Sequence, residues 1–381
     1  MSFLCVNIAA LWIPCLAAAQ KPSILFCSPG GTTGWSVNMA YVKELHGKGF
    51  EVDYTEDLDE FFKLSPERIR KYNVLVIYAT PDAYRVCHQN LRTSPEIAES
   101  FRKMIDDYVS AGGGVLLIPD EGNGRKQMVG DLTSMWDIKI ASERIVESNK
   151  DFISKLSNAS YDVPLQYTDN VVPSPVSEGV SGIWYPSGQH YNGSCTNPLV
   201  PGKDWRVVLK GSKTSVTRPF GSSKEDYDFG DRIAGVPNRD GVAEPDLFAV
   251  RDYNNGRIAV VCMMPQYSVG SGTQFTYDRQ ILSKGANGKK SDFGQLLENT
   301  YRWLAEPSLK SGAVGGYVTR DSALVPINYR KLVKDFNEYT FWFWEYDIAQ
   351  WHVPPKNGMI FKGLIGAHSA LSDGKGSVQE Y

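Results

Sequence analysis

The sequence predicts an α/β protein with a doubly wound, mostly parallel sheet over roughly residues 21–305. Three apolar runs, at 23–28, 73–79 and 114–118, lack polar alternation, which is the pattern of strands buried on both faces of a parallel sheet. Predicted helices alternate with these runs, and such alternation is typical of right-handed β–α–β crossovers.

A glycine-rich turn and a helix follow the first strand. The helix is predicted over 37–45, because apolar residues recur there at helical spacing and Gly47 and Gly49 come directly after. A second strand is predicted at 50–54, where polar and apolar residues alternate.

Two prolines mark the beginnings of further helices. Pro66 and Pro95 each stand in the first turn of a predicted helix, where an N–H would have no partner inside the helix. The second of these helices runs through Val109 and ends at a run of glycines before the strand at 114–118. Another helix is predicted at 125–136.

The second half of the chain differs in composition. Residues 150–245 are rich in Pro, Gly, Ser and Tyr, so we expect a long, loop-rich β insertion. Runs at 247–250 and 257–263 then predict an antiparallel hairpin around an Asn-Gly turn. A closing helix is predicted over 292–304, ending just before a proline.

Composition excludes some function classes. The 381 residues are 42% hydrophobic and 22% charged, with a net charge of −3, which is ordinary for a globular protein and predicts no binding to nucleic acid. None of the six cysteines forms a CxxC pair, so a zinc ribbon is excluded. Cys27 and Cys262 lie in apolar runs and are predicted to be buried free thiols.

The first 20 residues have the character of an export signal. They carry no charged side chain, and an apolar run at 8–19 ends in three alanines. We therefore expect a signal peptide at 1–20 and a secreted or periplasmic protein, with no stable membrane span because the run is short and contains Pro14. The absence of Lys or Arg before the run departs from the usual pattern, and leaves an apolar leader from a mis-started reading frame as the alternative.

Candidate catalytic residues follow the strand at 114–118. Asp120 and Glu121 stand at the carboxyl end of this strand, where open α/β sheets bind ligands, and could bind a cation or a sugar hydroxyl or act as a base. The alternative is that Asp120 caps the following helix. His190, in the insertion, could line the same site or lie in solvent.

A ligand-binding turn is predicted after the first strand. Backbone N–H groups at a helix start attract anions, although this turn is neither a Walker A sequence nor GxGxxG and contains no Lys. The alternative is a tight turn capped by Thr33 or Ser36. The predicted ligand-binding residues are Gly30, Gly31, Thr32, Thr33 and Trp35. Arg218 and Arg251 are further candidates for contact with an anion.

The order of strand, glycine-rich turn and helix, with a closing Trp-Leu-Ala helix, resembles the class I glutamine-amidotransferase-like fold and, more narrowly, ThuA-like proteins. The stretches at 111–117 and 253–260 support the resemblance, which implies a flavodoxin-like sheet over 21–307. Catalytic members place a Cys in the turn corresponding to 119–124 and add a His–Glu pair. Here the turn has neither Cys nor Ser, so the resemblance implies a domain without glutaminase activity.

A second resemblance lies at the other end of the chain. Residues 361–374 resemble the first motif of PHP-type metallohydrolases of the CehA/McbA-like branch, approximately L-H-x-H-[ST]-x-x-S-D-G. His368 matches the second His and Asp373 the Asp, and the resemblance makes them metal ligands. Gly366 stands in place of the first His, so the site is incomplete. A complete domain of this type implies Zn, Mn or Fe, and no cofactor is expected in this chain as it stands.

These observations predict a domain order and leave three functions open. Residues 308–355 are interpreted as a linker with an aromatic cluster at 341–344, and 356–381 as the truncated start of a PHP-type domain. The favoured function is a non-catalytic accessory or ligand-binding module attached to a metal-dependent hydrolase, with a small molecule such as a carbohydrate or a phosphoester as ligand. The alternatives are a hydrolase in its own right using Asp120, Glu121 and His190, and a structural or oligomerisation module.

Overall fold

The computed structural model divides the chain into two compact units, Met1–Ile327 and Asn328–Tyr381. All residues that the structure describes belong to the first unit. They are 20–27, 37, 39–55, 64–78, 95–118, 132–133, 135–141, 143–157, 162–187, 189–190, 193–194, 196–219, 239–261, 263, 270–271, 274–275 and 280–324. The predicted leader and the predicted PHP-type segment lie outside this part of the chain.

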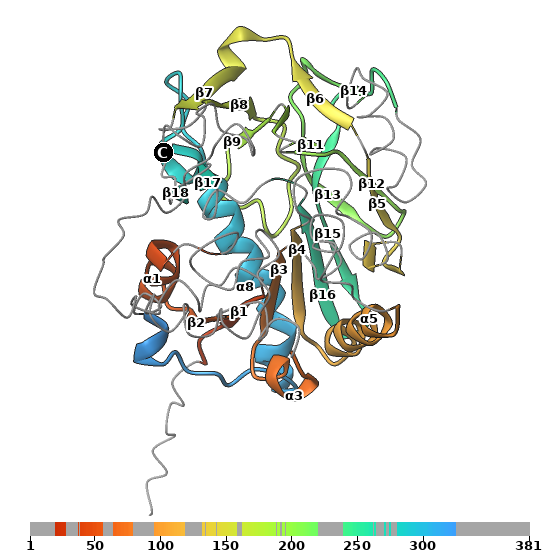
Figure 1. The fold of residues 1–381 in the computed structure, drawn as a ribbon, viewed down its shortest axis with the longest axis vertical. Coiled ribbons are helices and arrows are strands. Elements are labelled where there is room, and N and C mark those ends of the chain that lie inside the picture. Colours follow the sequence, from red (N-terminus) through yellow and green to blue (C-terminus); the bar gives the residue numbers. More distant parts are fainter. Residues whose placement is uncertain are drawn as a thin grey trace, which may run out of the picture. The chain divides into compact units, whose positions relative to one another are not determined.

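A mixed sheet forms the centre of the first unit, in the strand order β2-β1-β3-β4-β16-β15-β12-β5, with β13 also paired to β15 (Figure 1). The first five strands in this order are parallel, and the others join antiparallel. Their bounds are β1 Ser23–Cys27, β2 Glu51–Tyr54, β3 Val74–Tyr78, β4 Gly114–Ile118, β16 Gly256–Val261, β15 Asp246–Tyr253, β12 Leu199–Pro201, β5 Ile138–Ile140 and β13 Arg206–Lys210. The parallel half has the flavodoxin-like order 2-1-3-4-5, with β16 in the fifth place.

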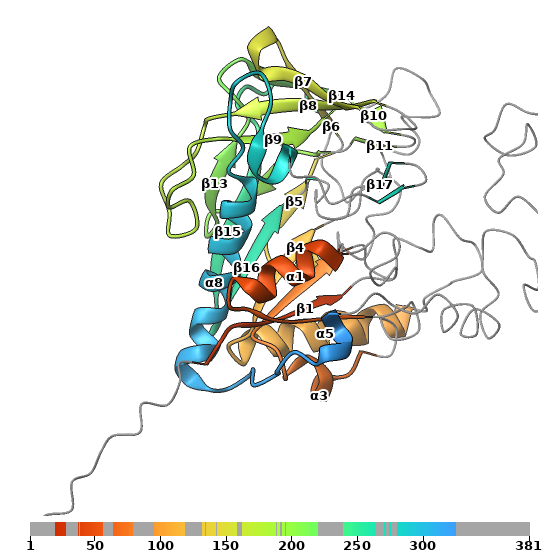
Figure 2. The ribbon, with the colours of Figure 1, turned by 90° about the vertical axis from the view of Figure 1, so that its left-hand side faces the viewer.

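Helices cover both faces of the parallel strands, so the predicted doubly wound α/β class is confirmed. Figure 2 shows α1 (Met39–Gly47) and α5 (Pro95–Ser110) on opposite sides of β1. On one face, the Phe26 ring contacts Tyr41 of α1 and Tyr301 of α8 (Phe293–Ser311), with ring centroids 6.4 and 6.3 Å apart. On the other face, Leu25 packs in one buried cluster with Ile105 of α5. Neighbouring residues of a strand point to opposite faces, which accounts for this division.

The short helix α3 (Pro66–Ile69) begins at the proline, as the sequence predicted. Ser65 caps it, since its side chain accepts a hydrogen bond from the Arg68 N–H, and Pro66 occupies the first helical position. Of the helix predicted at 125–136, the structure describes only Leu132, Thr133 and Met135 as helical, and 125–131 lie outside the described residues.

The closing helix is longer than the sequence predicted. Instead of ending before Pro307, α8 continues to Ser311, and Gly312 then ends it with a left-handed backbone (φ 68°). Pro307 has no N–H for the carbonyl of Trp303, four residues earlier. Arg257 of β16 supplies the missing donor, with its Nη1 2.6 Å from that carbonyl oxygen. A side chain from another strand therefore replaces the hydrogen bond that the proline removes, and the helix continues past it.

The insertion predicted at 150–245 contains several strands, and part of it belongs to the central sheet. Two of its strands, β12 and β13, pair with β15 and extend the central sheet. Its other strands form smaller ladders: β14 (Ser215–Pro219) pairs with β6 (Glu143–Glu147), which precedes the insertion, and β8 (Asp162–Thr168) pairs with β7 (Ile153–Ser157) and β9 (Ile183–Pro186). Gln189–His190 and Gly193–Ser194 form a further short ladder. The predicted hairpin after the insertion is present as β15 and β16, joined at Asn254, whose φ is 51°.

Residues 312–324, which belong to the linker predicted at 308–355, lie against the rest of the first unit. The N–H of Gly315 donates to the Arg70 carbonyl, and the N–H of Tyr317 to the Lys71 carbonyl, each at 2.9 Å. The segment ends in a 3-10 turn, η4 (Asp321–Leu324), which packs against β2 and α1. In the described part of the chain, no helix is long and apolar enough to cross a membrane.

Candidate functional site

The four central parallel strands end side by side at one edge of the sheet. Cys27 of β1 is in register with Ile77 of β3, and Tyr78 of β3 with Ile118 of β4. On the other side of β4, Leu117 is in register with Val260 of β16. Residues that follow these strands therefore leave the sheet from a common carboxyl edge.

The chain leaves two neighbouring strands of this edge toward opposite faces. From β1 it continues into α1, on the Phe26 face, and from β3 into α5, on the Leu25 face. This reversal between β1 and β3 is a topological switch point. In open α/β sheets, ligands bind in the crevice outside the carboxyl ends of the strands at such a point.

The residues predicted to bind ligand follow the strands of this edge. Gly30, Gly31, Thr32, Thr33 and Trp35 come after β1, and Asp120 and Glu121 come after β4. All seven lie outside the described residues, so their mutual geometry stays a prediction. Because only one residue separates Asp120 from Ile118 in the sequence, their Cα atoms can be at most about 7 Å apart. Since only β3 separates β1 from β4, the two strands lie about 10 Å apart.

The third predicted catalytic residue, His190, lies on a short hairpin. Its backbone belongs to β10 (Gln189–His190) and pairs with Gly193 of β11 (Gly193–Ser194). The His190 side chain lies outside the described residues.

The outgoing end of this hairpin is anchored at the carboxyl edge of the sheet. Thr196, two residues after β11, forms an antiparallel bridge with Met263, two residues beyond the end of β16. The Thr196 hydroxyl also donates to the Pro186 carbonyl at 2.6 Å, which ties the two ends of the hairpin together. The hairpin that carries His190 therefore starts next to the strand end that neighbours β4.

Further buried hydrogen bonds fix the base of the same hairpin. The N–H of Ser187 donates to the Pro164 carbonyl at 2.8 Å, and Asn197 Nδ2 donates to the Glu143 carbonyl at 3.0 Å. Ser187, Thr196 and Asn197 are all buried. These buried hydrogen bonds therefore fix the direction in which the hairpin projects from its base.

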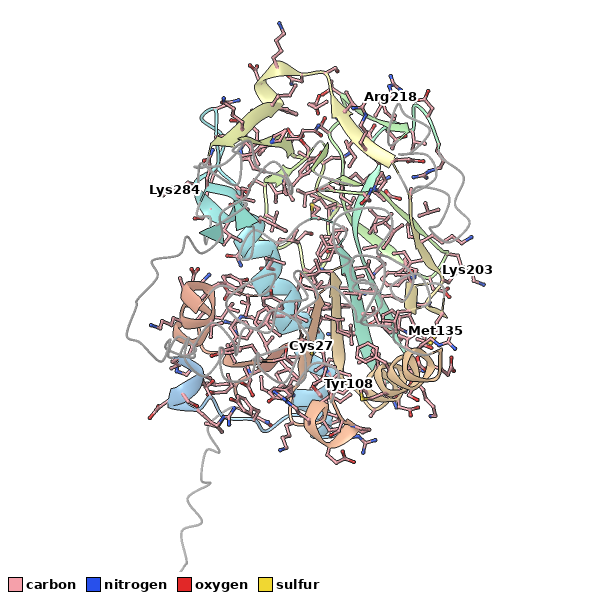
Figure 3. The ribbon with its side chains drawn as sticks, in the orientation of Figure 1. Cys27, Tyr108, Met135, Lys203, Arg218 and Lys284 are labelled. Carbon is pink, nitrogen blue, oxygen red and sulfur yellow. The ribbon has the colours of Figure 1, made fainter. Side chains whose placement is uncertain are left out.

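Cys27, at the switch point itself, is not a nucleophile. It is the buried last residue of β1 (labelled in Figure 3), and burial raises the pKa of its thiol from 9.0 to about 12. The thiol therefore stays protonated at neutral pH, whereas a nucleophilic Cys needs a lowered pKa. The prediction of a buried free thiol is confirmed for Cys27, and Cys262 lies outside the described residues.

The two candidate anion-binding arginines are already engaged within the protein. Arg218, at the periphery in Figure 3, forms an ion pair with Asp240 at 2.9 Å. Arg251 donates to the Trp136 carbonyl at 2.6 Å and pairs with Asp204 at 3.2 Å. Neither arginine lies at the carboxyl edge of the parallel strands.

Two buried carboxylates of β6, just before the insertion, were not predicted from the sequence. Glu143 is fully buried and is bound by the guanidinium of Arg239. Glu147 accepts hydrogen bonds from the hydroxyls of Ser212 and Thr214. No motif surrounds either residue, so only the folded structure could reveal them, and their satisfied hydrogen bonds indicate a structural role.

No group of three or more His, Cys, Asp or Glu side chains suited to a metal ion occurs within the described ranges. The predicted metal ligands His368 and Asp373 lie beyond those ranges, in the second unit.

Comparison with known proteins gives structural neighbours only. No family model matches the chain, and no curated protein does. The N-terminal domain of mmIFT52 is similar at 11% identity with a TM-score of 0.44, over 74% of this chain and 96% of that one. A Parabacteroides merdae protein described as ThuA-like is similar at 15% identity with a TM-score of 0.34, over 79% and 94%. The cytoplasmic protein STM3548 of Salmonella typhimurium is similar at 14% identity with a TM-score of 0.38, over 74% and 98%.

Proposed function

We propose that the first unit is a ligand-binding α/β module without catalytic activity of its own, joined to a PHP-type metal-dependent hydrolase. The observation that carries the binding role is the switch point between β1 and β3, because crossovers toward opposite faces open a crevice at the carboxyl edge. The absence of Cys and Ser from residues 119–124 supports a role without catalysis.

The proposed ligand is a small polar molecule, either a carbohydrate or a phosphoester. Asp120 and Glu121 would accept hydrogen bonds from sugar hydroxyls, since ionised carboxylates are acceptors only. Gly30 and Gly31 would let backbone N–H groups approach a phosphate closely. The apolar leader at 8–19 supports a protein that meets this ligand after export.

Calorimetric titration of the full chain tests the binding role. Glucose, glucose 6-phosphate and inorganic phosphate serve as separate ligands, so that sugar and phosphate recognition are distinguished. Asp120→Asn combined with Glu121→Gln should abolish binding of the sugar, and Gly31→Val should weaken binding of the phosphate. Asp240→Asn, in an exposed ion pair away from the edge, is the control and should change neither. If none of the three ligands binds the wild-type protein, the proposed ligand class is wrong.

One observation favours the alternative of a hydrolase in its own right. The bridge between Thr196 and Met263 anchors the His190 hairpin at the edge where the chain also leaves β4 toward Asp120 and Glu121. A general base and a second carboxylate could thus serve one substrate. Metal-dependent turnover of a chromogenic phosphoester, lost in both Glu121→Gln and His190→Ala, would support this alternative. We expect no turnover from the wild-type chain.

The link to a metallohydrolase rests on residues 361–374 alone, where His368 and Asp373 match the PHP motif. A complete site would bind Zn, Mn or Fe, with these residues among its ligands. Reading the source DNA downstream of the Tyr381 codon tests this part of the proposal. An open frame with further His and Asp motifs would support it, and a frame without them would contradict it.

A further inference from the structure

The strand β2 forms one edge of the central sheet, with β1 as its neighbour there. The N–H of Glu51 donates toward β1, to the Pro22 carbonyl at 2.9 Å, and the N–H of Thr55 donates to the Phe26 carbonyl at 3.0 Å. Because successive residues of a strand point their N–H groups to opposite sides, those of Val52 and Tyr54 point away from the sheet. Such outward groups are a template for pairing with another chain.

Both outward N–H groups of β2 are bound by side-chain oxygens. Val52 N donates to Thr319 Oγ1 at 2.8 Å, and Tyr54 N donates to Asp53 Oδ1 at 3.0 Å. Thr319 is held in return, because its own N–H donates to Glu51 Oε2 at 2.8 Å. Within the described strand, Glu51–Tyr54, no outward N–H is therefore left for a further strand.

The carboxylate that caps Tyr54 is itself fixed. Asp53 is 4% exposed, and its Oδ2 accepts a hydrogen bond from the Tyr72 hydroxyl at 2.6 Å. Arg320, next to Thr319, places a guanidinium nitrogen 3.8 Å from the same oxygen. The segment that contains Thr319 and Arg320 thus binds the Val52 N–H directly and helps to hold Asp53, which binds the Tyr54 N–H.

This segment, residues 314–320, is called the strap. It leaves α8 and runs beneath the strands to the side of β2, in blue in Figure 1. Asn73 Nδ2 donates to the Val314 carbonyl at 3.1 Å, and the Tyr317 ring lies 4.8 Å from the Tyr72 ring. These contacts fix the beginning of the strap, while Val318 within it is 71% exposed. Hydrogen bonds to Asn73 and β2 therefore fix its path together with the buried Val314 and the ring of Tyr317.

We infer that the strap is a cap, acting within one chain, that closes the β2 edge to strand pairing with a second copy of this protein. Thr319 and Asp53 bind the two N–H groups that an incoming strand would need. The strap crosses the position that such a strand would occupy, and it must be displaced before two β2 edges can meet.

Hydrogen exchange on the full chain tests the cap. Thr319→Val removes the oxygen that binds Val52 N–H with little change in shape, so exchange of the Val52 amide should accelerate about fivefold, the effect of one ordinary hydrogen bond. Thr319→Ser should restore the wild-type rate, and Val318→Ala, in the same strap but without a bond to β2, should leave it unchanged. An unchanged Val52 amide in Thr319→Val would overturn the inference.

Analytical ultracentrifugation tests the consequence for self-association. Gly315→Val should displace the strap, because Gly315 has φ 117° and a Cβ there would lie 2.4 Å from Asn73 Nδ2. Combined with Thr319→Val, it should produce a concentration-dependent dimer that neither wild type nor Val318→Ala forms. A double variant that keeps native tryptophan fluorescence and stays monomeric at all concentrations would overturn the role in edge protection.

Discussion

Arg257 Nη1 lies 2.6 Å from the carbonyl oxygen of Trp303, the carbonyl that Pro307 leaves without its donor inside α8. The same guanidinium lies over the Trp303 ring at 4.6 Å and pairs with Glu306 at 2.6 Å. Arg257 of β16 thus supplies the hydrogen-bond donor that α8 lacks at Pro307.

Replacing Arg257 should destabilise the protein strongly. Arg257→Met leaves the Trp303 carbonyl without a donor, and we expect the free energy of unfolding to fall by about 1.5 to 3 kcal/mol, the range for hydrogen bonds to charged groups. Urea denaturation measures this loss. Arg206→Met is the control, because Arg206 also lies over the Trp303 ring but its ion pair with Asp252 is exposed, and the substitution should cost less than about 1 kcal/mol.

A double-mutant cycle tests whether Arg257 stabilises the protein through its hydrogen bond to the Trp303 carbonyl. In Pro307→Ala, the backbone N–H returns to position 307 and can bind the Trp303 carbonyl itself. The cost of Arg257→Met should therefore be about 1 kcal/mol smaller in that background. Equal costs in both backgrounds would show that Arg257 acts through its ion pairs and its contact with the Trp303 ring, and not through the Trp303 carbonyl.

Cys27 should make the stability depend on pH in the alkaline range. Below pH 9 the thiol is protonated in both states, and its burial adds no pH dependence. Between pH 9 and about 12 it ionises only in the unfolded state, because burial raises the pKa of the folded thiol to about 12, so stability falls. Cys27→Ala removes this contribution. The stability difference between wild type and variant should narrow by about 1.4 kcal/mol from pH 8 to pH 10. A constant difference in chemical denaturation would contradict the raised pKa.

Replacing Arg239 should lower the stability of the protein much more than replacing Arg218, although each arginine forms an ion pair with a carboxylate. Arg239→Met would leave Glu143, whose side chain is 0% exposed, as a buried charge without its partner, at a cost of about 3 to 5 kcal/mol. Arg218→Met removes an exposed pair with Asp240, at a cost below about 1 kcal/mol. Thermal denaturation of both variants at pH 7 checks this. Similar costs would mean that Glu143 finds another partner.

Two glycines should respond to alanine in opposite directions. A Cβ at Gly114 would lie 2.5 Å from the Leu304 carbonyl oxygen, so Gly114→Ala should push α8 away from β4 and cost about 1 to 3 kcal/mol. A Cβ at Gly47, the last residue of α1, would meet nothing within 4 Å. Gly47→Ala should therefore stabilise the protein by about 0.4 to 1 kcal/mol. Denaturant unfolding measures both, and a neutral Gly114→Ala would contradict the close packing of α8 on β4.

The sequence predicted those elements whose signals are local. The strands at Ser23–Cys27, Val74–Tyr78 and Gly114–Ile118 are continuous apolar runs, and the cap of α3 is visible in Ser65 and Pro66. The turn Asn254-Asn255, followed by Gly256 between β15 and β16, is equally local. Each of these signals lies within a few residues of the element that it determines.

Features that depend on distant partners could not be predicted in this way. Leu199 pairs with both Ile140 and Asp246, which brings β12 of the insertion into the central sheet, and no local pattern marks that choice. The continuation of α8 past Pro307 depends on Arg257, far earlier in the chain. The strap is held by single hydrogen bonds such as that from Val52 to Thr319, which leave no periodic pattern in the sequence.

The candidate site was predicted as residues that follow strands, and the structure adds which strands are neighbours. Sequence alone could not show that β3 is the one strand between β1 and β4, nor that Thr196 brings the His190 hairpin to the end of β16. The side chains of Asp120, Glu121 and His190 lie outside the described residues, so their convergence stays a prediction.

The place of β16 in the sheet has a consequence for the order of events during synthesis. β16 is parallel to β4, with Arg257 in register with Gly114, yet the entire insertion lies between them in the chain. While the ribosome is still making the insertion, the far side of β4 has no neighbour, and the apolar residues 115–118 border an open edge. Pairings between such distant segments form slowly, and open edges are sites of aggregation. Docking of the β15–β16 hairpin is therefore the step that closes this edge of β4.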